Sequence, residues 1–175
     1  MCAICNFKLD FSVGHPLALK IAVAARKAID AGLIDAVDTT EGALSAARMR
    51  LSAIEALNLL QARVETAHGE AALLALPDFY VLLIENDTWG FFHATTVGFD
   101  PDIVPEMPDV TATEDALHSN IVITSEAALR AWLDGRFQLA RALEDDLFVI
   151  DAPQTHAASL TQMLASAEAA TLAVG

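Results

Sequence analysis

The first residues with a chemically suggestive spacing are Cys2 and Cys5, which form a C-x-x-C pair with His15 ten residues further on. Two thiolates and an imidazole are ligands that tetrahedral zinc prefers. A fourth ligand does not follow from the sequence; it could come from a second subunit or from another histidine, namely His68, His93, His118 or His156. A redox C-x-x-C normally opens a helix, whereas this pair precedes an expected strand. We expect no resident cofactor, and zinc held by Cys2, Cys5 and His15 is the alternative hypothesis.

Cys2 offers a second kind of chemistry. If Met1 were removed, the Cys2 thiol would lie beside its own α-amine, which can act as the base for an N-terminal nucleophile. The start MCAIC resembles the MCGI start of class II glutamine amidotransferases over these five residues. The resemblance implies an enzyme with an N-terminal nucleophile as an alternative function. The mass of the intact protein tests it, because a retained Met1 would leave Cys2 without a free α-amine.

A third group of residues could bind a ligand without catalysing a reaction. Apolar side chains at the spacing of strands and helices are candidates for lining a pocket, namely Trp89, Phe91, Phe99, Trp132, Leu133, Phe137 and Met163. Residues of these types at such spacing also fill protein cores, so both interpretations stay open. The sequence contains no Walker loop, G-x-S-x-G or H-E-x-x-H motif. We therefore predict no catalytic residue.

The composition limits the classes of partner. The chain of 175 residues has a formal net charge of −14 and no Lys or Arg between Arg63 and Arg130. Phosphate binding needs clustered basic side chains, so we expect no nucleic-acid partner. The chain is 54% hydrophobic with a mean hydropathy of +0.42. This is high for a soluble chain and indicates an apolar pocket or a subunit interface.

The same numbers bear on location. No apolar run approaches the ~18 residues of a membrane span, so we expect no integral membrane segment. Asp10 interrupts the start of the chain, and no basic residues precede an apolar block there. A secretory signal would show that pattern, so we expect a cytoplasmic protein. The length fits one domain.

The clearest local structure lies between residues 120 and 151. The β-branched run 121–123 predicts a strand, and Ser125 can cap a helix that follows it. Gly135 can end that helix, and a second short helix and a strand at 147–150 complete the pattern. The predicted order is strand, helix, glycine, helix, strand.

The rest of the chain shows the same kinds of signal. Residues 7–13 alternate apolar and polar side chains and predict a strand. Helical periodicity predicts helices over about 16–31, 41–68 and 154–173, and two apolar runs predict a hairpin of 79–84 with 89–97. The proline-containing segment 99–109 predicts an extended loop or a lid.

This order of elements from Glu41 onward resembles the sterol carrier protein type-two fold over about residues 41–170. The resemblance implies an α+β fold, with an antiparallel sheet covered by helices on one face and an apolar tunnel for fatty acyl or sterol-like ligands. Residues 1–40 then form an N-terminal strand and helix added to a body of residues 41–175, within a single domain. The second helix is longer than in that family.

Our leading hypothesis is therefore a non-enzymatic protein that binds an apolar small molecule between sheet and helices and forms a homodimer. It rests on an excess of apolar residues and a scarcity of reactive groups. One alternative is an enzyme that uses Cys2 or a metal site. The other is a homodimeric interaction module, in which the long helix 41–68 pairs between chains and no ligand is bound.

Overall fold

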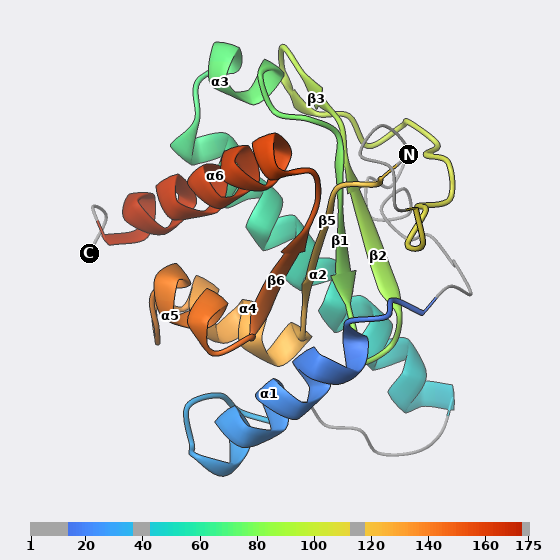
Figure 1. The fold of residues 1–175 in the computed structure, drawn as a ribbon, viewed down its shortest axis with the longest axis vertical. Coiled ribbons are helices and arrows are strands. Elements are labelled where there is room, and N and C mark those ends of the chain that lie inside the picture. Colours follow the sequence, from blue (N-terminus) through green and yellow to red (C-terminus); the bar gives the residue numbers. More distant parts are fainter. Residues whose placement is uncertain (1–13, 37–42, 113–117, 173–175) are drawn as a thin grey trace.

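A four-stranded sheet stands between helices in the computed structural model (Figure 1), which describes residues 14–36, 43–112 and 118–172. The elements are α1 (Ala18–Asp30), α2 (Ala43–Ala67), α3 (Glu70–Leu74), β1 (Phe79–Leu83), β2 (Thr88–Phe92), β3 (Ala94–Thr95), β4 (Gly98–Phe99), β5 (Ile121–Thr124), α4 (Glu126–Leu133), α5 (Leu139–Glu144), β6 (Phe148–Asp151) and α6 (Gln154–Leu172). The α+β class predicted from the sequence is confirmed. The expected strand at residues 7–13 lies outside the described residues.

The strand order in the sheet is β2-β1-β5-β6. The hairpin of β1 and β2 is antiparallel, as predicted, and β5 and β6 also pair antiparallel. The central pair differs from a purely antiparallel sheet, because β1 and β5 run parallel, with Tyr80 opposite Ile121. The reason is topological. β2 ends beside the first residue of β1, and the segment that follows, which includes the small β3–β4 pair, leads to β5 at that same end of the sheet, so β5 runs in the direction of β1.

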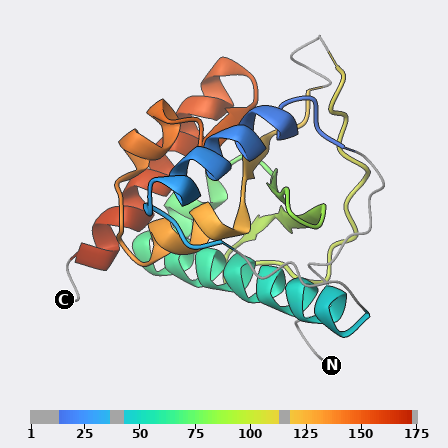
Figure 2. The same cartoon turned by 90° about the horizontal axis from the view of Figure 1, so that it is seen from below.

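The two faces of the sheet carry different cores. Because side chains alternate along a strand, Val81 and Val122 face one side together with Phe148, and this cluster packs against α2, α4, α5 and α6. Tyr80 and Ile121 face the other side, in a separate cluster completed by residues of α1 and the loop before β5. The four helices α2, α4, α5 and α6 cover the first face, whereas α1 (blue in Figure 2) contributes to both clusters, with Ile21 in the second and Ala24, Ala25 and Ala28 in the first.

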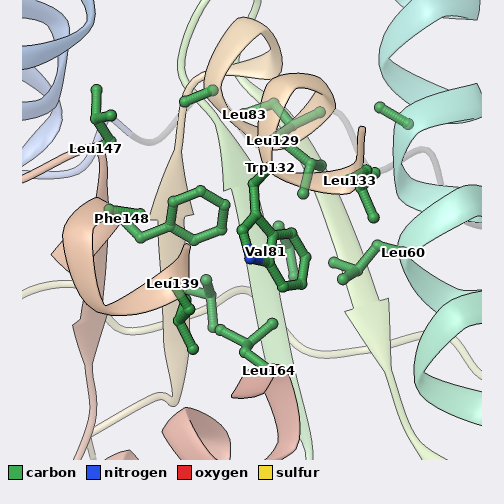
Figure 3. Packing of buried hydrophobic residues seen from close by; sticks show 14 of the residues in the cluster. Leu60, Val81, Leu83, Leu129, Trp132, Leu133, Leu139, Leu147, Phe148 and Leu164 are labelled. Atoms are coloured by element: carbon green, nitrogen blue, oxygen red, sulfur yellow. The ribbon is translucent and has the colours of Figure 1, made fainter. Parts of the chain in front are cut away.

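The central stretch folds as its local signals predict. The Ser125 side chain accepts a hydrogen bond from the Ala128 N–H at 3.0 Å and begins α4. Gly135 has a φ of +73° and follows the end of that helix. The largest side chain of α4, Trp132, points into the core beside Val81 (Figure 3), with its ring centroid 5.6 Å from that of Phe148. Local capping and long-range packing therefore agree over this segment.

The long helix predicted at 41–68 is present as α2, whose 25 residues correspond to about 38 Å. Its buried face, formed by Ala53, Ala56, Leu57, Leu60 and Val64, packs on the first face of the sheet. Within the described ranges, none of the helices combines the length and the apolar character that crossing a bilayer requires.

The predicted extended segment after Phe99 is a loop that crosses the second face of the sheet. Val110 packs against the apolar cluster there. The Tyr80 hydroxyl donates a hydrogen bond to the Glu106 carbonyl at 2.6 Å. Burial raises the pKa of Tyr80 to about 12, with the nearby carboxylates adding to the shift. The phenol therefore stays a protonated donor at neutral pH and ties the loop to the strand.

Candidate functional site

A large cavity lies between α1 and α5, next to the start of β6, and has a volume of about 760 Å³. Figures 1 and 2 show the two helices side by side. Its lining residues come from α1 and the turn after it, and from the segment between α5 and β6: Pro16, Leu19, Lys20, Val23, Ala24, Lys27, Ala28, Ala31, Leu33, Arg141, Glu144, Asp145, Asp146 and Leu147. We call this cavity the α1–α5 groove.

Apolar side chains of α1 reach solvent inside the α1–α5 groove. Leu19 is 75% exposed and Val23 is 48% exposed, and they lie four residues apart on one helical face. The opposite stripe of α1, at Ile21, Ala25 and Ala28, is buried. The rest of the protein thus covers only part of the apolar surface of α1. The uncovered part forms an apolar wall that another molecule can contact.

Charged side chains surround this wall. Lys20 forms an ion pair with Asp146 at 2.8 Å, and Arg141 pairs with Asp145 at 3.2 Å. Asp146 has a φ of +57°, an uncommon conformation for a residue with a side chain, at the turn between α5 and β6. Lys27 makes no ion pair with any described residue. It is therefore the basic side chain of the groove that is available to an anionic group.

A second polar cluster lies on the second face of the sheet, where α1 and β5 begin and β6 ends. Asp151 lies 3.0 Å from the Nε2 of His15 and 3.0 Å from the Nε2 of His118. Neither contact has the alignment of a good hydrogen bond. The Nδ1 of His15 accepts a hydrogen bond from the Leu17 N–H at 3.1 Å. Burial lowers the pKa of His15, with His118 adding to the shift and Asp151 opposing it. The neutral ring therefore carries its proton on Nε2, which faces the Asp151 carboxylate at the end of β6.

The structure separates the residues predicted to line a ligand pocket. Trp89 and Phe91 belong to the cluster on the second face of the sheet. The others are buried in the cluster on the first face, namely Phe99, Trp132, Leu133, Phe137 and Met163. None of the seven lines the α1–α5 groove. Leu19 and Val23, which line it, were missed. The sequence feature that could have identified them is the presence of apolar residues on more than one face of α1.

The predicted metal ligands are placed only in part. Cys2 and Cys5 lie outside the described residues. His15 is 5% exposed and is engaged by Leu17 and Asp151. In the part of the chain that the structure describes, no group of three or more His, Cys, Asp or Glu residues is arranged to hold a metal ion. The zinc hypothesis for Cys2, Cys5 and His15 therefore stays a prediction.

Comparison with known proteins assigns no function to these residues. No family model matches the chain, and neither a curated protein nor a solved structure matches it.

Proposed function

We propose that this chain is a cytoplasmic small-molecule binding protein that holds the apolar chain of a fatty acyl-like ligand in the α1–α5 groove. The observation that carries the proposal is the pair of exposed apolar side chains, Leu19 and Val23, inside a cavity of about 760 Å³. Cavities of roughly 300–1,000 Å³ are typical of small-molecule sites. The resemblance of residues 41–170 to sterol carriers favours the same ligand class, although α1 belongs to the N-terminal extension.

Binding in the groove follows from apolar burial. Each methylene removed from water contributes about 0.8 kcal/mol. Affinity should therefore rise about fourfold per added methylene until the groove is full. Lys27, on the same wall, can pair with a carboxylate head group. No covalent step is needed, which agrees with the absence of a predicted catalytic residue.

Titration of delipidated protein with a fluorescent fatty acid tests the proposal. Val23→Glu places a charge on the apolar wall and should weaken binding at least about tenfold. Val97→Glu is the matched control, because Val97 is 95% exposed and lies outside the groove. Equal binding by both variants, or no saturable uptake by the wild type, would contradict the proposal.

A second candidate function is a homodimeric module, and the exposed face of α2 favours it. Leu44, Leu51 and Leu59 are 78%, 56% and 53% exposed and share one side of the helix. If two copies of α2 crossed antiparallel with a two-fold axis next to Leu51, each Leu44 would lie opposite a Leu59. Each exposed Arg48 would then lie opposite an exposed Glu55. The apolar and charged positions of this surface therefore match across such an axis, where Glu55 also lies 3.8 Å from Arg130 of its own chain.

Sedimentation equilibrium distinguishes the dimer from a monomer. Leu51→Glu should shift the protein toward the monomer by at least about tenfold in dissociation constant, because a charge would be buried at the two-fold axis. Val104→Glu is the control, since Val104 is 88% exposed on the loop after β4. A wild-type protein that stays monomeric at high concentration would exclude this module.

A further inference from the structure

The apolar wall of the α1–α5 groove has a direction along α1. Its two large exposed apolar side chains, Leu19 and Val23, both lie on the N-terminal side of Lys27. The three residues are spaced four apart within α1 and therefore form one stripe on the helix. This stripe has a basic group at one end and apolar side chains over the rest of its length.

The charges of the groove follow the same direction. Lys20 forms its ion pair with Asp146 of the opposite wall at 2.8 Å. Glu144 precedes Asp146 by two residues, also lines the groove and makes no ion pair with any described residue. Lys27 lies seven residues beyond Lys20, which is about 10 Å along the helix. An anionic group is therefore repelled at the Lys20 end of the groove and attracted at the Lys27 end.

The rise of the helix gives the length of the stripe. Leu19 and Lys27 are eight residues apart in α1, which corresponds to about 12 Å. An extended chain advances about 1.2 Å per bond, so about ten bonds cover this length. Among the described residues, this wall continues past Leu19 only with Pro16, in the turn before the helix. A longer chain therefore finds little further apolar surface along the stripe.

We propose that the α1–α5 groove selects a free medium-chain fatty acid, of about eight to twelve carbons, with its carboxylate at Lys27 and its methyl end near Leu19. The inference rests on the proposed function and adds the length, the head group and the orientation of the ligand. A neutral ester or thioester of the same acid gains no ion pair at Lys27. The last methylenes of a longer acid stay in water and add no affinity.

Competition against a fluorescent fatty acid tests the chain length on the full chain. The competitors are saturated acids of even carbon number from hexanoate to hexadecanoate, each used below its micellar concentration. Affinity should rise by up to about fourfold per methylene as far as decanoate or dodecanoate, and should then level off.

Shortening the stripe should move this break. Leu19→Gln removes the far apolar side chain, and Val23 lies only about 6 Å from Lys27 along the helix, so the break should fall to about six carbons. Leu44→Gln is the matched control, because Leu44 is 78% exposed on α2 and does not line the groove. It should leave the break where it is in the wild type.

The head group is tested by comparing decanoate with 1-decanol. Lys27→Met removes the charge and keeps an unbranched side chain. It should weaken decanoate about twofold to fivefold, as the loss of an exposed ion pair does, and leave 1-decanol unchanged. Arg26→Met is the matched control, since Arg26 is an exposed cation of the same helix outside the groove. It should leave both affinities unchanged.

The outcomes separate this inference from the function on which it rests. Affinities that keep rising to hexadecanoate, or an unchanged break in Leu19→Gln, would overturn the inference and leave the proposed function standing. Equal weakening of decanoate and 1-decanol by Lys27→Met would do the same. A wild-type protein that takes up no fluorescent fatty acid would overturn both.

Discussion

The imidazole of His15 and the carboxylate of Asp151 stand 3.0 Å apart and join the start of α1 to the end of β6. The two residues are far apart in the sequence, yet they meet on the second face of the sheet. His118, just before β5, meets the other oxygen of the same carboxylate. Two imidazoles from two separate segments therefore meet the same carboxylate of one strand.

This arrangement predicts how stability depends on pH. Burial lowers the pKa of His15 below 6.5, so the unfolded chain takes up a proton first as the pH falls. The contribution of His15 to stability is full above pH 6.5 and is lost below it, with a slope of at most about 1.4 kcal/mol per pH unit. His15→Gln should flatten this part of the profile. Urea unfolding between pH 5 and pH 8 measures it, and parallel profiles for both proteins would contradict the expectation.

Glu85 should stabilise α4 by capping its first turn from another segment. Its two oxygens accept from the backbone N–H groups of Glu126 and Ala127. Burial raises the pKa of Glu85, and these two hydrogen bonds oppose the shift. Glu85→Ala should reduce the free energy of unfolding by about 1–2 kcal/mol, as losing a helix cap does. Urea denaturation measures the loss, and a change below about 0.5 kcal/mol would show that water replaces the cap.

Gly98 should not tolerate a side chain. Its φ is +121°, and a Cβ there would lie 2.7 Å from the Glu65 Oε1, which accepts a hydrogen bond from the Phe99 N–H at 2.9 Å. Gly98→Ala should therefore cost about 1–3 kcal/mol of stability. Gly69→Ala is the matched control, because nothing lies within 4 Å of a Cβ at that position. Equal melting temperatures for the two variants would contradict the strain at Gly98.

Trp132 should behave as a core residue. It is 2% exposed, and its Nε1 donates to the Glu168 Oε1 at 3.1 Å. Trp132→Ala should reduce the free energy of unfolding by about 3–5 kcal/mol, because it leaves a cavity and removes a hydrogen bond. A loss below about 1 kcal/mol would instead indicate an open space at this residue, as expected for the wall of a ligand pocket. Guanidinium unfolding followed by circular dichroism measures it.

Local sequence signals were enough to predict the helices and strands that depend on neighbours along the chain. The segment from β5 to β6 could be predicted because Ser125 caps α4 and Gly135 follows its end. Both effects act within a few residues. The period of α2 and the apolar runs of the β1–β2 hairpin were visible for the same reason. The α+β class follows from the order of these elements.

The candidate sites could not be predicted in this way, because packing between distant segments creates them. Lys20 and Asp146 form an ion pair across the α1–α5 groove, and no periodic pattern links α1 to the turn between α5 and β6. The parallel pairing of β1 with β5 is likewise chosen by the course of the chain between them. Leu19 and Val23 have the same residue types as core positions. They line a groove only because α1 turns its other face to the sheet and α4, so tertiary contacts decide which apolar residues stay available.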